Sequence, residues 1–265
     1  MLVNRRSFAI LGLASLGLGA APPTTPAVKP TSAVKPASAV VIDPVTARDP
    51  LASLLADART GYARLRDYTC TFTRQDRVGG VLSAEQVAEL KVRVQPLGIV
   101  IRIARPESLA GQEMVYAERT GPVSKMKMKP AGSNDYRILS IDDPKVLAVS
   151  RRPITQQGMN AILDTLSEVV RREKALNNPV EVYSSDYLFA GRPVTRYEIF
   201  TRRPHTHRTF YRAVICVDKE MKLPVRYEAY DQPRSGGPSL GDLMEVYSYS
   251  DIRSNVGLGD STFSR

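Results

Sequence analysis

Tryptophan is absent from the 265-residue sequence, and aromatic residues make up only 7% of it. Sites that stack nucleic-acid bases or sugars depend on aromatic rings, so this composition argues against both kinds of site. Two cysteines are too few for a disulfide scaffold. The chain therefore has to be stabilised by an apolar core, for which its length and its 43% hydrophobic content are sufficient.

Signatures of catalysis are also missing. The sequence contains no Gly-x-Ser-x-Gly motif, no phosphate-binding loop and no His-Glu-x-x-His motif. Its only histidines are His205 and His207, which would share one face of a strand but lack a further ligand set. A surface loop is the favoured interpretation of the pair. We expect a protein that is not an enzyme and needs no cofactor or metal; an enzyme that uses either histidine is the less favoured alternative.

Positive charge is abundant but is not gathered into a cluster. The sequence has 37 Lys and Arg against 27 Asp and Glu, a net charge of +10, and the basic and acidic residues are interspersed along the chain. Nucleic-acid binding needs clustered cations on one face, so we expect no nucleic-acid partner. Short pairs at 151–152, 171–172 and 202–203 either hold anionic head groups at the mouth of a cavity or keep the surface solvated. They are compatible with transient contact with a membrane surface.

Residues 1–20 have the pattern of an export signal. Arg5 and Arg6 precede an apolar, glycine-rich run over 8–21, which is shorter than the roughly 20 residues of a membrane-spanning helix. Small residues at its end predict cleavage near Ala20. The paired arginines are similar to a twin-arginine signal, with ordinary Sec export as the alternative. We expect a periplasmic or otherwise exported protein that is soluble after cleavage; an uncleaved signal would act as an anchor.

Residues 21–49 are rich in proline and repeat the sequence Ala-Val-Lys-Pro at 27–30 and 33–36. Proline every few residues prevents helix formation and favours an extended polyproline II chain, so this segment is predicted to be a semi-rigid spacer. The composition changes at Asp49 and Pro50, which are typical of a helix start. We therefore place the folded domain at 50–265.

Two segments of this domain have apolar residues at helical spacing, one from Leu51 to Leu65 and one over 155–176. Elsewhere apolar and polar residues alternate as in half-buried strands. The predicted strands are 68–74, 90–95, 99–103, 113–118, 124–129, 136–141, 180–187, 194–201, 210–218, 225–230 and 243–249. This order is typical of an α+β protein whose antiparallel sheet has helices on one face.

A candidate ligand-binding surface lies on the apolar face of three of these strands. Alternation places their apolar side chains on one side, and flexible methionines are suited to lining a cavity that accepts varied apolar shapes. A packed core without a cavity, with the lysines between the methionines in solvent, is the alternative. The predicted lining consists of Leu90, Val92, Val94, Ile99, Ile101, Ile103, Met126 and Met128.

Cys70 and Cys216 each lie in a predicted strand. A disulfide between them would persist in an exported protein, but two buried thiols that pack as small apolar groups are the favoured alternative. Sequence does not give the Cα separation that would decide between the two.

Several motifs resemble a known superfamily. The segment 217–228 (Val-Asp-Lys-Glu-Met-Lys-Leu-Pro-Val-Arg-Tyr-Glu) and the final motif that starts at Tyr247-x-Tyr-x-Asp-Ile resemble the C-terminal signature of the LolA-like superfamily. The segments 68–80 (Tyr-Thr-Cys-Thr-Phe-x-Arg-x-x-Arg-Val-Gly-Gly), 152–155 (Arg-Pro-Ile-Thr) and 205–213 (His-x-His-x-x-Phe-Tyr-Arg-Ala) are similar to an uncharacterised bacterial family within it, a domain of unknown function.

This resemblance covers residues 51–265 and departs from the family pattern at 114–120, where a glycine-rich turn is usual. It implies a strongly curved, incomplete β-barrel whose concave face is covered by helices, in an envelope protein that binds lipid or the acyl chains of a lipoprotein. The leading hypothesis is therefore an exported binding protein or carrier for an apolar ligand. The alternative is an envelope interaction or sensor domain that uses the same fold to bind a protein partner.

Overall fold

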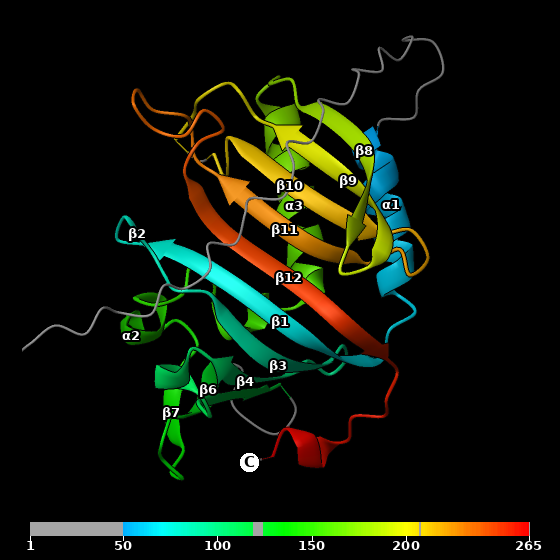
Figure 1. Cartoon of the computed structure of the whole chain (residues 1–265). Coiled ribbons are helices and arrows are strands. Elements are labelled where there is room, and N and C mark those ends of the chain that lie inside the picture. Colours follow the sequence, from blue (N-terminus) through cyan, green and yellow to red (C-terminus); the bar gives the residue numbers. More distant parts are fainter. Residues whose placement is uncertain (1–49, 119–123, 207, 265) are drawn as a thin grey trace, which may run out of the picture. The chain divides into compact units, whose positions relative to one another are not determined.

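The computed structural model describes residues 50–118, 124–206 and 208–264. Within this part of the chain, one antiparallel sheet runs in the order β7-β6-β5-β4-β3-β1-β12-β11-β10-β9-β8, with the short β2 paired to β1 (Figure 1). The end strands β7 and β8 pair with one neighbour each, so the sheet is not closed into a barrel. The predicted export signal and spacer lie outside the described residues and remain predictions.

Every strand predicted from the alternation is present, with small differences at the ends. The strands are β1 (Asp67–Val78), β2 (Val81–Leu82), β3 (Gln86–Arg93), β4 (Gly98–Arg105), β5 (Glu113–Ala117), β6 (Lys125–Lys129), β7 (Arg137–Ser140), β8 (Glu181–Phe189), β9 (Arg192–Phe200), β10 (Arg212–Asp218), β11 (Pro224–Tyr230) and β12 (Leu243–Ser254). Of the segment 114–120, where the sequence departs from the family pattern, residues 114–117 belong to β5 and 119–120 lie outside the described residues.

Two helices provide the cover for one face of the sheet. Helices α1 (Pro50–Tyr62) and α3 (Met159–Ala175) contact each other, and α3 also contacts β11. Their apolar stripes, such as Leu54 and Leu166, share one cluster of buried side chains with the inward positions of the strands. The expected α+β fold, an open antiparallel sheet with helices on one face, is confirmed. Among the described residues, no helix is both long and apolar enough to cross a membrane.

The second helix begins four residues later than predicted. Residues Ile154–Gln156 form a separate 3₁₀ turn, η2, and Gly158 is extended before α3 begins at Met159. Apolar spacing alone does not distinguish a 3₁₀ turn from the first turn of an α-helix, because the two differ in only part of a residue per turn. Sequence reasoning also missed the short helix α2 (Pro144–Leu147), whose N-cap Asp143 accepts a hydrogen bond from the Lys145 amide.

The opposite face of the sheet carries two smaller apolar clusters. In one of them, Phe263 from the chain's last segment covers Val100 and Val115. The other contains Cys216, whereas Cys70 belongs to the main core on the helix-covered face. Both thiols are free and buried, and they lie in clusters on opposite faces of the sheet. The structure therefore supports the interpretation of the two cysteines as small apolar groups.

Candidate functional site

All the residues predicted to line a cavity belong to the main core on the helix-covered face. Six are buried, and Val94 and Met128 are partly buried against the same cluster. Buried side chains alone do not make a binding site, because a filled core has the same alternation. A binding site also requires open space beside such residues.

A first pocket lies beside β4, β5, β6 and β7 and has a volume of about 260 Å³. We call it the methionine pocket. Three predicted residues line it, and Met114, the cross-strand neighbour of Met128, adds a third thioether. Its described lining consists of Arg74, Ile101, Gln112, Met114, Met126, Met128, Arg137, Leu139, Lys145, Val146, Val149, Ser150, Arg152, Ile154 and Gln157.

A second pocket lies between β3, β4 and the start of α3 and has a volume of about 290 Å³. We call it the helix pocket. Three other predicted residues line it, while Leu90 and Ile103 pack in the core and line neither pocket. The described lining of the helix pocket consists of Tyr62, Val92, Val94, Leu97, Ile99, Thr155, Gly158, Asn160 and Ala161.

The segment around η2 separates the two pockets. Ile154 and Gln157 line the methionine pocket, whereas Thr155 and Gly158 line the helix pocket. On β4 below this segment, Ile101 lines the methionine pocket. Ile99, two residues earlier on the same face of the strand, lines the helix pocket. Ile154 is 3% exposed, so its side chain is packed within this partition.

Hydrogen bonds to buried groups fix the partition in place. The Gln157 amide Nε2 donates to Ser150 Oγ over 3.1 Å and to the Arg152 carbonyl oxygen over 2.9 Å. The Tyr249 hydroxyl donates to the Gln157 carbonyl oxygen over 2.9 Å. At the start of α3, the Met159 amide donates to the Tyr68 hydroxyl over 3.1 Å. Movement of η2 would have to break several of these bonds.

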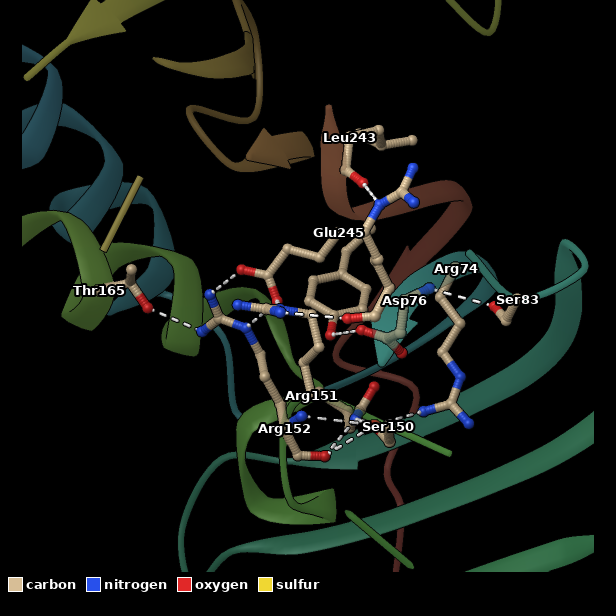
Figure 2. Close-up of polar contacts among 12 residues, drawn as sticks. Arg74, Asp76, Ser83, Ser150, Arg151, Arg152, Thr165, Leu243 and Glu245 are labelled. Atoms are coloured by element: carbon tan, nitrogen blue, oxygen red, sulfur yellow. Dashed lines mark hydrogen bonds and ion pairs between the residues drawn. The ribbon is translucent and has the colours of Figure 1, made fainter. Parts of the chain in front are cut away.

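A buried ion pair lies next to this segment (Figure 2). The Arg152 guanidinium donates to both carboxylate oxygens of Glu245, with Nε–Oε2 at 3.0 Å and Nη2–Oε1 at 2.5 Å, and to Thr165 Oγ1 over 2.8 Å. It also lies over the rings of Tyr227 and Tyr247. These contacts neutralise the charge of Arg152, so this ion pair connects the η2 segment, α3 and β12 rather than offering a free cation.

Three of the four arginines in the other two pairs also contact carboxylates, and Arg203 donates to the Asn177 carbonyl oxygen. Arg171 and Arg172 both contact Glu168 on α3, and Arg202 contacts Glu181 on β8. None of the four residues at 171–172 and 202–203 lines the methionine or the helix pocket. Neither pocket therefore supports a head-group role for these two pairs, and that role stays a prediction.

Of the two histidines, the structure describes His205. His205 Nε2 lies 2.7 Å from Oε1 of the buried Glu173 on α3, and His207 lies outside the described residues. Within the described part of the chain, no group of three or more His, Cys, Asp or Glu side chains is placed to hold a metal ion.

The most informative residue that sequence reasoning missed is Arg74. It follows the inward positions 68, 70 and 72 of β1 and is itself buried, at 6% exposure. Its guanidinium donates to Gln86 Oε1 over 3.0 Å and to Ser150 Oγ over 3.3 Å. Figure 2 shows Arg74 and Arg152 on opposite sides of Ser150. A charged residue at an inward position of an alternating strand is the signal that could have identified it.

Comparison with known families assigns the chain to one of them. The profile of a family described as a protein of unknown function, DUF1571, matches residues 65–265. The chain belongs to this family, as the motif resemblance predicted. A comparison with curated proteins finds no match.

Solved structures with a similar fold include LolA-like proteins. Lipoprotein LppX of Mycobacterium tuberculosis is 13% identical with a TM-score of 0.47, covering 80% of this chain and 100% of that one. A putative outer membrane lipoprotein-sorting protein domain of Vibrio parahaemolyticus is 15% identical with a TM-score of 0.35, covering 80% and 97%. A LolA superfamily protein of Nitrosomonas europaea is 12% identical with a TM-score of 0.31, covering 81% and 97%.

Proposed function

We propose that this protein is exported to the cell envelope and binds an apolar ligand, a lipid or the acyl chains of a lipoprotein, between the sheet and its helices. Two neighbouring pockets on the predicted apolar face carry this proposal. Binding would be driven by burial of the chain, which contributes about 0.8 kcal/mol per methylene, without a covalent step. Release of the ligand would make the protein a carrier.

The size of the pockets sets a condition on binding. Sites for drug-sized molecules typically have volumes of about 300–1,000 Å³, and each pocket is slightly smaller than this range. A full acyl chain would therefore need both pockets at once. Because residues of the η2 segment line both, displacement of Ile154 would join them along β4. We propose that this segment moves when the ligand enters.

Native mass spectrometry with lipid extraction tests the proposal on the full chain purified from the envelope of an exporting host. An extractable compound with an acyl chain supports it and identifies the class of ligand. The apo protein should also take up the apolar fluorescent probe N-phenyl-1-naphthylamine. A chain that is purified empty and does not take up the probe would contradict the proposal, because its pockets would then be unavailable to ligand.

The role of the partition is tested with two matched substitutions. Ile154→Ala removes the side chain that separates the pockets, whereas Ile162→Ala removes an equally buried isoleucine of α3 that lines neither. Both should destabilise the fold by about 2–5 kcal/mol. Only Ile154→Ala should change probe uptake and increase the preference for longer chains. Equal ligand profiles for the two variants would show that η2 is only part of the core.

A binding surface for a protein partner is the second candidate, favoured by strand β8. Among the described residues, this end strand pairs only with β9, and it exposes Tyr183, Tyr187 and Leu188 at 49%, 49% and 66%. An unpaired edge with exposed apolar groups is suited to the addition of a strand from a partner. Under this alternative, Tyr187→Lys should abolish capture of an envelope protein in cross-linking experiments, while probe uptake stays as in the unmodified chain.

A further inference from the structure

The charged residues that line the methionine pocket are all cationic. Four cationic residues line the pocket, and none of its described lining residues is acidic. Arg152 is neutralised by Glu245. Arg137 and Lys145 form no ion pair with any described carboxylate, and Arg74 forms none within ion-pair distance, although its charge interacts with the buried Asp76. An apolar floor below a cationic lining that contains no carboxylate is complementary to a ligand that combines an apolar chain with a negative charge.

Arg74 is the cation best placed to contact a bound anion. Gln86 and Ser150 engage Nε and Nη1 of its guanidinium, and they fix its plane from two sides. The second terminal nitrogen, Nη2, makes no hydrogen bond to any described residue. A guanidinium whose orientation is fixed in this way loses little entropy on binding a carboxylate or phosphate, and charge-assisted hydrogen bonds are stronger than neutral ones.

Gln157 supplies a second, independent indication of a ligand. Its side chain lines the pocket and the residue is 1% exposed, yet Oε1 has no hydrogen-bond partner among the described residues. The assignment of Oε1 and Nε2 follows from the bonds, because Nε2 donates to the Arg152 carbonyl oxygen, which only accepts. A buried acceptor without a partner costs about 1–3 kcal/mol, so a donor from a ligand would relieve it.

We infer that the methionine pocket holds the head-group end of an anionic amphiphile. Arg74 contacts the carboxylate or phosphate, Arg137 and Lys145 attract it at the rim, and a hydroxyl or N–H next to the anion donates to Gln157. The chain extends over Met114 and Met126 toward η2 and the helix pocket. This inference rests on the proposed function and specifies the ligand class. A soft cation on the methionine sulfurs is disfavoured, because the surrounding charges are positive.

The test compares two ligands that differ only in the head group, dodecyl phosphate and dodecanol. Each displaces N-phenyl-1-naphthylamine from the full chain at low salt. The unmodified protein should bind the phosphate at least about tenfold more tightly than the alcohol. Arg74→Gln should remove most of this preference and leave the affinity for dodecanol within about twofold, and thermal melting checks that the variant is folded. Inorganic phosphate should not compete with dodecyl phosphate; competition at equal concentration would contradict the amphiphile assignment.

Substitutions of exposed cationic residues test the same inference without disturbing the core of the fold. Lys145→Gln and Arg137→Gln change exposed side chains at the rim, and Arg66→Gln is a matched control at an exposed arginine that lines neither pocket. The rim variants should each weaken dodecyl phosphate by about two- to fivefold, an effect that disappears at high salt, and the control should have none.

The outcomes separate this inference from the proposed function. If the probe and dodecanol bind but the phosphate has no advantage in any variant, the anionic head group is wrong and the apolar site stands. If the probe, the alcohol and the phosphate all fail to bind, the proposed function is contradicted and the inference with it.

Discussion

The apolar face of the sheet is filled at its centre and open toward one end. At the centre, Phe72 stacks on Tyr249 with ring centroids 5.2 Å apart and lies 5.8 Å from Tyr247, and all three are buried. Toward β7, the same face carries Met126 and Met128 and borders a pocket of about 260 Å³. The central strands β1 and β12 are visible in the middle of the sheet in Figure 1.

Both regions come from the same alternation of apolar and polar residues, so alternation does not decide between a core and a pocket. The size of the side chains and the segments that pack over them decide whether a core or a pocket forms. At the centre, aromatic rings and α3 fill the space over the sheet. At the methionine pocket, the segments that cover the sheet are the short helix α2 and the 3₁₀ turn η2. Long helices do not by themselves exclude a cavity, because the helix pocket is lined by the end of α1 and the start of α3.

The largest expected effect is at the buried Arg152–Glu245 ion pair, where Arg152 contacts the central rings of Tyr227 and Tyr247 and also lines the methionine pocket. Glu245→Gln leaves the charge of Arg152 buried without a partner and should lower the free energy of unfolding by about 3–5 kcal/mol, measured by chemical denaturation. Glu220→Gln is the control, because Glu220 contacts Arg192 at the surface and is 84% exposed. It should cost at most about 1 kcal/mol. Similar losses at both sites would mean that Arg152 finds compensation after Glu245 is removed.

Side-chain truncation at the two regions compares them directly. Phe72→Ala should cost about 3–5 kcal/mol, because it leaves a cavity among packed rings. Met128→Ala should cost less than about 2 kcal/mol, since this partly buried side chain already borders open space. Urea denaturation of both variants gives the values. A larger loss at Met128 than at Phe72 would contradict the description of this region as open.

The filled region should also respond to pH through Asp76. Burial raises the pKa of this carboxyl, although hydrogen bonding from the Tyr247 hydroxyl and the charge of Arg74 oppose the shift. The folded chain therefore retains a proton that the unfolded chain releases, and stability should fall as pH rises from about 4 through the folded-state pKa. Asp76→Asn should remove this part of the pH dependence. Superimposable stability–pH curves for the two proteins would contradict the shift.

The smallest effect is expected from reducing agents. Burial raises the pKa of the Cys216 thiol to about 11 and that of Cys70 still further. Both thiols should resist a thiol-reactive dye until the protein unfolds, and dithiothreitol should leave the melting temperature unchanged. A drop in melting temperature on reduction would indicate a disulfide and a different arrangement of the two faces.

The sequence was sufficient for the sheet and for the face on which its apolar residues lie. Strands such as β3 and β4 have a clear period of two, and that period depends on neighbouring residues only. The candidate site was predicted in part: Ile101, Met126 and Met128 line one pocket, and three further residues line the other. The division into two pockets could not be predicted, because it depends on where η2 lies over β4.

The charged part of the site was harder to predict, because ion pairs form between residues far apart in the sequence. Arg151 and Arg152 stand out as a pair, yet both contact Glu245 on a distant strand. Arg74 does not stand out by charge clustering, and its importance depends on its place among the residues that line the methionine pocket. Contacts of this kind become visible only when the register of every strand is known.

One contact on the face of the sheet opposite the helices also constrains which substitutions this sequence can accept during evolution. A side chain added at Gly98 would lie 2.9 Å from the Phe263 ring, so these two positions, which are far apart in the sequence, share one space. They cannot vary independently. In relatives where the first position has gained a side chain, the second should have exchanged its ring for a smaller group, and paired substitutions of this kind would record the contact in an alignment.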